Sequence, residues 1–224
     1  CSRRQFILAV LLFISVAAES AVVDTTRFYM RHSYDVLKYK LDVNLWQCYL
    51  NPYPRTFQAQ EVISLRADSA LNSIRLNAVN NSIGVDSVKL NGVSFVHAND
   101  TLTVNLDRTY QPGEVLDIMI YYRHKNIFDK GFYTYYGVVF TDSPPEGARK
   151  WLVCWDRPSD KAMWELNARV PLNVRLGSTG LLVDSTIVAD TINYHWKSDL
   201  PVSTYLITFT SRVNYLIHKR YWQR

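Results

Sequence analysis

The stretch Tyr39-Lys40-Leu41-Asp42-Val43-Asn44-Leu45 alternates apolar and polar side chains without a break. Successive side chains of a β-strand point to opposite faces, so a period of two predicts a strand with one buried and one solvated face. The same alternation returns from Phe57 to Arg66, after the turn residues Asn51-Pro52-Tyr53-Pro54. This part of the chain is therefore predicted to be β structure.

Short alternating or apolar runs, separated by turn residues, continue along most of the chain: 85–90, 93–96, 102–106, 116–122, 174–176, 181–183, 191–196 and 205–209. Asn91-Gly92 predicts a type I′ hairpin between the first two runs, because that turn needs positive φ at both central residues. The sequence contains no long amphipathic pattern, internal repeat or linker. We predict an all-β fold, a β-sandwich or a saddle of packed antiparallel sheets, as one domain over residues 27–212.

The first residues have the pattern of an export signal. Ser2-Arg3-Arg4 precedes an apolar run from Phe6 to Ala18 that only Ser15 interrupts, and the run ends in small residues. A membrane anchor is the alternative, but a spanning helix needs roughly 20 apolar residues. We predict a signal peptide over residues 1–20, cleaved after Ala18 or Ser20, and a mature chain that is secreted or periplasmic and makes no membrane contact.

Charge and cysteine content narrow the classes of partner. The sequence has 25 Lys and Arg against 20 Asp and Glu, and without residues 1–18 it keeps 23 basic and 20 acidic residues, a net charge of +3. So small an excess does not favour nucleic acid. Cys48 and Cys154 remain, and both a disulfide and two buried free thiols are consistent with the sequence. Cys154 lies in the apolar run Trp151–Trp155, which predicts a buried strand and a packing role.

No motif for catalysis or metal binding occurs in the sequence. None of the five histidines forms an H-E-x-x-H pair, and there is no zinc-finger cysteine pair, G-x-S-x-G or phosphate loop. We therefore predict no catalytic residue and no metal ligand in this chain. The cluster Tyr133-Thr134-Tyr135-Tyr136 has two interpretations, an aromatic platform for a ligand or strand packing, and we favour packing.

Glu61 breaks the expected pattern of its strand, because it lies in phase with Phe57, Ala59, Ile63 and Leu65. It marks either a slot that faces another domain or a bulge that turns the carboxylate to solvent. We favour the bulge, since a buried unpaired charge is costly.

The stretch Gly147-Ala148-Arg149-Lys150-Trp151-Leu152-Val153-Cys154-Trp155-Asp156-Arg157-Pro158-Ser159-Asp160-Lys161-Ala162 resembles a family motif. It is similar to the G-A-R-x-W-x-x-C-x-D-x-P-S-D-K-A segment of the amino-terminal β-domain of zinc aminopeptidases of the aminopeptidase N and leukotriene hydrolase family. Further pieces in the same order resemble that domain: Tyr34–Tyr39, Val88–Gly92, Gly137–Thr141, His195-Trp196 and Leu200–Leu206. Their order and spacing extend the resemblance over nearly the whole mature chain.

The resemblance implies an all-β domain packed on a catalytic domain of the same polypeptide, which supplies the H-E-x-x-H zinc site and the G-x-M-E-N substrate loop. Neither motif occurs before Arg224. The resemblance therefore implies that this chain is inactive alone, that zinc belongs to the catalytic domain, and that residues 213–224 form a truncated junction to it.

In the family, the run T-Q-x-E-P-E-x-A-R forms part of the active-site wall, and one of its Gln or Glu residues holds the α-ammonium of the peptide substrate. The matching run here is Thr141–Arg149, in which Asp142 takes the place of the Gln and Pro144 that of the ammonium-binding residue. Proline has no side-chain acceptor. The resemblance thus makes Asp142 and Glu146 the candidate substrate-binding residues, while solvated loop acids are the equally weighted alternative.

The other residues of the motif are expected to be structural: Arg149, Cys154, Asp156, Pro158, Asp160 and Lys161. Charged groups in an apolar segment need partners, so Arg149 or Lys161 should pair with one of the acids. Pro158 should fix a turn through its restricted φ.

Three hypotheses for function follow. The first is the non-catalytic amino-terminal domain of an exported zinc aminopeptidase. The second is a secreted binding or scaffold module that lacks peptidase activity, which Pro144 favours. The third is a carbohydrate-binding β-sandwich that uses the aromatic residues of Tyr133–Tyr136.

Overall fold

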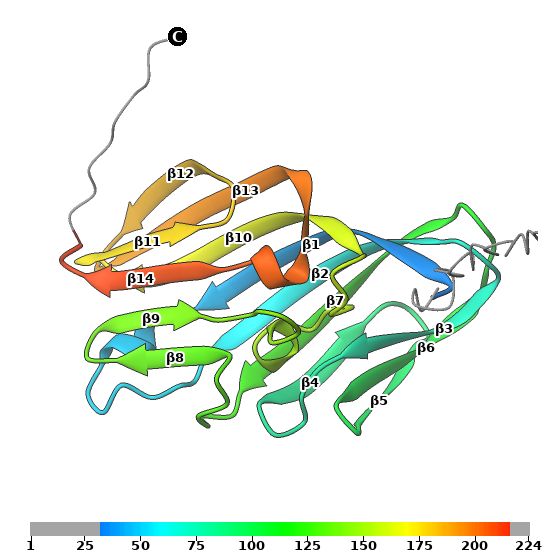
Figure 1. Ribbon diagram of the computed structural model, residues 1–224, viewed down its shortest axis with the longest axis horizontal. Helices are drawn as coiled ribbons and strands as arrows, with labels where there is room; N and C mark the ends of the chain where they lie inside the picture. Colours follow the sequence, from blue (N-terminus) through cyan, green and yellow to red (C-terminus); the bar gives the residue numbers. More distant parts are fainter. Residues whose placement is uncertain (1–31, 216–224) are drawn as a thin grey trace, which may run out of the picture. The chain divides into compact units, whose positions relative to one another are not determined.

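The computed structural model describes residues 32–215. The predicted signal peptide, residues 1–20, and most of the predicted junction lie outside the described residues. Within residues 32–215 the fold is all-β, as predicted, with 14 strands in three sheets (Figure 1).

The largest sheet has seven strands in the order β12-β13-β10-β1-β2-β7-β4. Their bounds are β12 Leu181–Val188, β13 Thr191–Ser203, β10 Lys161–Pro171, β1 Tyr34–Asn44, β2 Gln58–Ala67, β7 Val115–His124 and β4 Ile83–Lys89. Five of the six strand pairs are antiparallel, but β1 and β10 run parallel, with Lys38 opposite Met163 and Asn44 opposite Arg169. The central pairing of this sheet thus joins segments far apart in the sequence.

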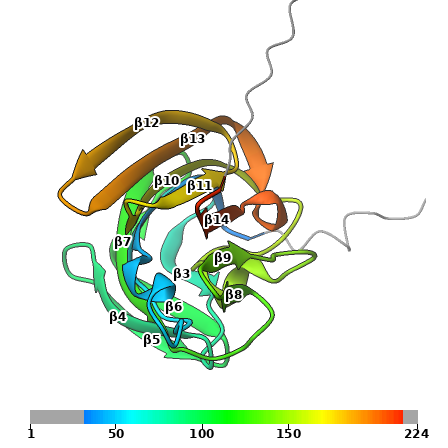
Figure 2. The ribbon, with the colours of Figure 1, turned by 90° about the vertical axis from the view of Figure 1, so that its left-hand side faces the viewer.

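Two smaller sheets complete the fold. The four-stranded sheet has the order β11-β14-β9-β8, with bounds β11 Val174–Ser178, β14 Phe209–Val213, β9 Val138–Thr141 and β8 Phe132–Tyr135. The three-stranded sheet has the order β3-β6-β5, with bounds β3 Leu71–Asn77, β6 Thr101–Tyr110 and β5 Ser94–Ala98. In Figure 2 the seven-stranded sheet curves around the four-stranded sheet. The described part of the chain also has short 3-10 turns between strands, at Trp46–Tyr49, Ala148–Lys150 and Thr204–Leu206.

The core lies between the sheets and is rich in aromatic side chains. Tyr39 of β1, Tyr122 of β7 and Trp164 of β10 are buried on the inner face of the large sheet, while Phe132 and Phe209 are buried on the four-stranded sheet. Each large aromatic side chain removes much apolar area from water, and this burial is the main term that stabilises such a fold.

The predicted hairpin at Asn91-Gly92 is wrong. The flanking strands β4 and β5 belong to different sheets, because β4 pairs with β7 while β5 pairs with β6. Gly92 has φ of +72°, so the turn uses the conformation that the sequence signals, but it connects two sheets. The tight hairpin lies one turn later, where Asn99 and Asp100 have φ of +51° and +56° and join β5 to β6.

The predicted bulge at Glu61 is also wrong. Glu61 pairs in register with Leu41 on one side and Ile120 on the other, and its side chain is fully buried on the inner face. The alternation of side chains in β2 therefore places Glu61 in the core, although burying a carboxyl costs free energy.

Candidate functional site

The signature segment, which we define as residues 142–160, joins β9 to β10 and so crosses from the four-stranded to the seven-stranded sheet. Trp151, Leu152, Val153 and Cys154 are fully buried in it. A regular strand was expected here, but the segment has a 3-10 turn followed by a single bridge, in which Cys154 exchanges two backbone hydrogen bonds of 2.7 and 3.1 Å with Asn77. Its burial therefore comes from side-chain packing between the sheets.

Trp151 anchors the start of the segment. Its ring meets those of Phe209 and Trp164 edge-on, with centroids 5.4 and 6.3 Å apart. Its indole Nε1–H donates to the buried Ser143 Oγ at 3.2 Å, and Ser143 Oγ donates to the carbonyl of Ile207 at 3.3 Å. A buried tryptophan whose N–H has a partner is a rigid anchor, so the backbone on both sides of residues 144–150 is held in place.

Arg149 is the centre of an ion-pair network on the segment. Its Nε lies 2.9 Å from Asp156 Oδ2, and one of its terminal nitrogens lies 2.8 Å from Glu146 Oε2. Arg157 approaches the other oxygen of Glu146 at 2.7 Å. The pairing of Arg149 with a motif acid is the one that we predicted from the cost of a buried charge.

Asp156 is fully buried, and its remaining hydrogen-bonding capacity is used by residues from elsewhere in the chain. Thr204 Oγ1 donates to Asp156 Oδ1 at 2.8 Å, and the Asp156 backbone N–H donates to Asn77 Oδ1 at 3.0 Å. The sequence gives no local signal for Asn77 and Thr204, because they lie 79 and 48 residues from Asp156.

The remaining motif residues lie where packing and turns require them. Cys154 is buried with a free thiol, as is Cys48. Asp160 lies 3.3 Å from His32 Nε2, whereas Lys161 at the start of β10 is exposed. Pro158 is exposed in a turn in which the N–H of Asp160 donates to the carbonyl of Arg157 at 3.1 Å. None of these side chains joins the Arg149 network.

The two candidate substrate-binding residues differ in availability. Glu146 has both carboxylate oxygens in ion pairs, with Arg149 and Arg157. Asp142 is exposed and its side chain has no ion pair among residues 32–215, while its backbone N–H donates to the carbonyl of Gly131 at 2.9 Å. Pro144 and Pro145 are also exposed. Asp142 is therefore the acid of the loop that is free to meet a cation.

Glu61 lies directly beneath the segment. Its Oε2 accepts the backbone N–H of Val153 at 3.3 Å, and its Oε1 is buried without a hydrogen-bond partner. Desolvation raises the pKa of this carboxyl well above its ordinary value, against the opposing effect of the Val153 hydrogen bond. Burial therefore favours the protonated form of this carboxyl, because a neutral group costs less free energy to bury than a charged one.

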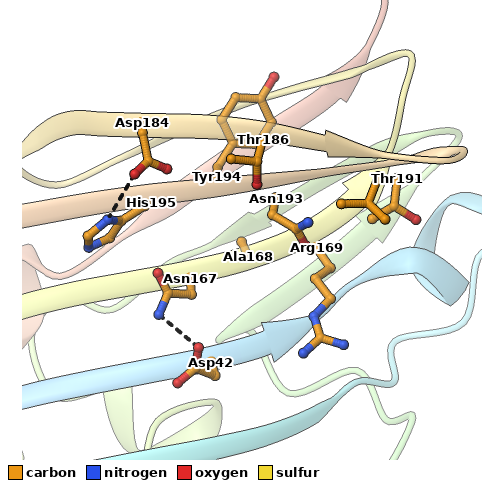
Figure 3. Close-up of a pocket in the computed structure, with 11 residues that line it drawn as sticks. Asp42, Asn167, Ala168, Arg169, Asp184, Thr186, Thr191, Asn193, Tyr194 and His195 are labelled. Atoms are coloured by element: carbon orange, nitrogen blue, oxygen red, sulfur yellow. Dashed lines mark hydrogen bonds and ion pairs between the residues drawn. The ribbon is translucent and has the colours of Figure 1, made fainter.

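A polar groove of about 620 Å³ lies elsewhere, on the outer face of the large sheet between β12, β13, β10 and β1 (Figure 3). Asn167 Nδ2 donates to Asp42 Oδ1 at 2.8 Å, and His195 Nδ1 lies 3.8 Å from Asp184 Oδ2 (Figure 3). His195 Nε2 also lies 3.3 Å from Glu165 Oε1. These polar groups pair with one another across the strands and do not converge on a common point.

Two further findings concern residues 32–215 only. No group of three or more His, Cys, Asp and Glu side chains is arranged there to hold a metal ion. No helix within this range has the length and apolar character needed to cross a bilayer.

These features define a class of protein: an all-β domain of one mixed seven-stranded sheet and two small sheets, with an anchored segment that presents an acid and two prolines to solvent. The family model described as the Peptidase M1 N-terminal domain matches residues 32–206, which is most of the chain. The chain therefore belongs to this family, and the resemblance drawn from the motif is confirmed.

Solved structures agree with this assignment. A mutant M1 zinc metallopeptidase from Deinococcus radiodurans, bound to a Tyr-Ser-Ala substrate, has a TM-score of 0.72 at 23% identity over 80% of this chain and 42% of its own. The M1 zinc metallopeptidase from Deinococcus radiodurans has a TM-score of 0.71 at 22% identity, with 81% and 42% covered. A two-domain M1 zinc metallopeptidase mutant bound to L-arginine has a TM-score of 0.72 at 23% identity, over 81% of this chain and 43% of its own.

At these identities the structures establish a shared fold, and this chain spans less than half the length of the proteins it matches. A comparison with curated proteins found no match.

Proposed function

We propose that this chain is the non-catalytic amino-terminal domain of an exported zinc metallo-aminopeptidase. The full-length reaction is the removal of amino-terminal residues from peptides. In this proposal the domain packs on the catalytic domain of the same polypeptide, which holds the zinc ion, and forms one wall of the active site. The observation that carries the proposal is the match to the M1 amino-terminal domain over residues 32–206.

The geometry of the signature segment supports a positioning role for this wall. Trp151 and the Arg149–Asp156 pair fix the segment between the sheets, and Asp142 projects from its start with a free carboxylate. An exopeptidase must hold the substrate's α-ammonium at a set distance from the scissile bond, and a carboxylate on a rigid segment does this. Because Pro144 has no acceptor and Glu146 is paired, we assign the ammonium contact to Asp142.

The test uses the full-length protein expressed from its complete gene. The zinc-loaded protein is assayed with an amino-acid p-nitroanilide and with the same compound acetylated on its α-amine. We expect Asp142→Ala to lower kcat/KM on the free-amine substrate roughly tenfold to a hundredfold, the usual worth of a hydrogen bond to a charged group. Asp199→Ala, which removes an exposed acid on β13, is the matched control and should leave kcat/KM unchanged.

The alternative is a secreted binding or scaffold module without peptidase activity, which the proline at position 144 favours. A reading frame that lacks H-E-x-x-H beyond Arg224 would support this alternative and overturn the enzyme proposal. If the motif is present but Asp142→Ala behaves like Asp199→Ala, the enzyme proposal stands and the assignment of the ammonium contact is wrong.

Export is part of the same proposal. It rests on the charged start and apolar run of residues 1–20, which have the pattern of a signal peptide. Amino-terminal sequencing of the protein recovered from the periplasm or medium tests it, and we expect the mature chain to begin after Ala18 or Ser20. Recovery of the uncleaved chain from the cytoplasm would contradict export.

A further inference from the structure

A small pocket of about 260 Å³ lies at the turn between β8 and β9, at the opposite end of β9 from the signature segment. Its walls include Asn51, Tyr53, Arg55, Tyr135 and Tyr136, and we call this set the tyrosine pocket. Nothing in the proposed function uses these residues. Their side chains nonetheless combine features that strand packing does not explain.

Packing explains the inner half of the tyrosine cluster and leaves the outer half unexplained. Tyr133 stacks on Phe140 with centroids 4.5 Å apart and ring planes 3° from parallel, and Thr134 is buried and donates to the carbonyl of Tyr53. By contrast, Tyr135 and Tyr136 are 67% and 71% exposed. The favoured packing interpretation of this cluster therefore holds only for Tyr133 and Thr134.

The exposed rings form a corner. Tyr135 and Tyr136 meet edge to face with centroids 4.5 Å apart, and Tyr53 meets Tyr136 in the same way at 5.6 Å. In an edge-to-face pair one ring presents its edge to its neighbour, so ring faces stay available to a ligand. Tyr53 and Tyr136 have φ of +60° and +44°, which is unusual and costly for bulky residues. Such strain on two sides of one pocket is a reason to seek a function there.

Arg55 is a cationic side chain of the pocket with no acidic partner among residues 32–215. Its guanidinium lies 5.3 Å from the centroid of the Phe128 ring, and it makes no ion pair with any acid of residues 32–215. Its Nε is buried without a hydrogen-bond partner. Its backbone is fixed, because the Arg55 N–H donates to Asn126 Oδ1 at 2.7 Å. The side chain as a whole is partly exposed, and a guanidinium without an acid partner pairs well with a ligand carboxylate.

We propose that the tyrosine pocket binds an acidic saccharide, a uronic-acid residue of an oligosaccharide or polysaccharide. The carboxylate pairs with the guanidinium of Arg55. The C–H face of the sugar ring packs on the exposed ring of Tyr135, and its hydroxyls bond to the Asn51 amide and the phenol groups. A uronic acid carries its carboxylate and its apolar ring face on one rigid unit, which matches a cation beside aromatic rings.

The test is calorimetric titration of the purified protein with trigalacturonic acid and with its methyl ester, in which a neutral ester replaces each carboxylate. We expect the acid to bind more tightly than the ester. Tyr135→Ala should weaken binding of the acid roughly tenfold, in line with the worth of an aromatic contact. Arg55→Gln should bring the affinities of acid and ester together. Tyr215→Ala, which removes a half-exposed tyrosine beyond β14, is the matched control and should change neither.

Equal binding of the ester by the unmodified protein would overturn the assignment to an acidic sugar. Equal loss of binding in the Tyr135 and Tyr215 variants would show that the pocket is not the site. A tetraglutamate peptide that binds as tightly as trigalacturonic acid would replace the saccharide by an acidic peptide and overturn the proposal. None of these outcomes bears on the peptidase assay, because the pocket and Asp142 lie at opposite ends of β9.

Discussion

At the scale of single residues, Glu61 shows how a carboxyl is accommodated in an apolar core. Glu61 lies in β2, in register with Leu41 of β1, and its Oε2 accepts a hydrogen bond from the backbone N–H of Val153. Because burial raises its pKa, the folded state holds more tightly a proton that the unfolded state releases above its ordinary pKa of 4.5. Its contribution to stability is therefore complete below that pH and is lost as pH rises towards the raised folded pKa.

Glu61→Gln keeps the shape of the side chain and removes its titration. We expect the unfolding free energy of the unmodified protein to fall as the pH rises above the ordinary pKa of Glu61, with a slope of up to about 1.4 kcal/mol per pH unit from this group, and the variant to lose this slope. Urea unfolding followed by tryptophan fluorescence at several pH values measures both.

The matched control for Glu61 is Asp117→Asn, which removes a solvated carboxyl from the exposed face of the neighbouring strand β7. The control should keep the pH dependence of the unmodified protein. An unchanged slope in Glu61→Gln would mean that the carboxyl is ionised in the folded state.

At the scale of secondary-structure elements, β12 is the most exposed strand of the large sheet. All eight residues from Leu181 to Val188 are exposed, and among residues 32–215 the strand is hydrogen-bonded only to β13. Ile187 and Val188 are each 63% exposed, and the strand contains no Lys, Arg or Pro. Natural edge strands usually carry such residues to prevent pairing with another chain. The free edge of β12 is therefore suited to pairing with a strand of another chain.

We expect the 224-residue chain expressed alone to self-associate, and Ile187→Lys to reduce this association by placing a charge on the free edge. Light scattering over a range of concentrations measures the mass of both. Val115→Lys, an equal change at an exposed valine of β7, far from the β12 edge in the strand order, should leave self-association unchanged. A monomer at all concentrations for the unmodified chain would contradict this prediction.

Sequence patterns predicted strands well and their partners poorly. The alternation at Tyr39–Leu45 and Phe57–Arg66 located β1 and β2, because the burial of one face fixes the side-chain period. The hairpin predicted at Asn91-Gly92 is wrong, since a turn with positive φ shows that the chain bends but does not show which strands then pair. In the site, Arg149 and Asp156 were found from their motif, while Tyr53 and Arg55 gave no signal because their pocket forms only when loops from distant segments meet.

At the scale of the whole domain, residues 32–215, long-range pairing holds the fold together. The parallel pair β1–β10 joins Lys38 to Met163 across most of the chain. Strand β14 closes the four-stranded sheet between β9 and β11. The predicted domain end at residue 212 lies inside β14, and the family match ends earlier, at residue 206. Whether the folded domain ends at residue 206 or after β14 therefore depends on how much β14 contributes to its stability.

We expect a chain ending at Leu206 to lose cooperative folding, although it retains every residue that the family model matches. Such a chain lacks Phe209, which is 1% exposed and packs on Trp151, and it leaves β9 and β11 without the strand between them. Losing one buried Phe side chain costs about 3–5 kcal/mol, a large share of the 5–15 kcal/mol that stabilises a typical domain.

A chain ending at Tyr215 keeps all described strands and serves as the control. Urea unfolding followed by tryptophan fluorescence and circular dichroism should give a sharp transition for the control and a broad one, or none, for the shorter chain. Equal midpoints would show that the domain is complete without β14.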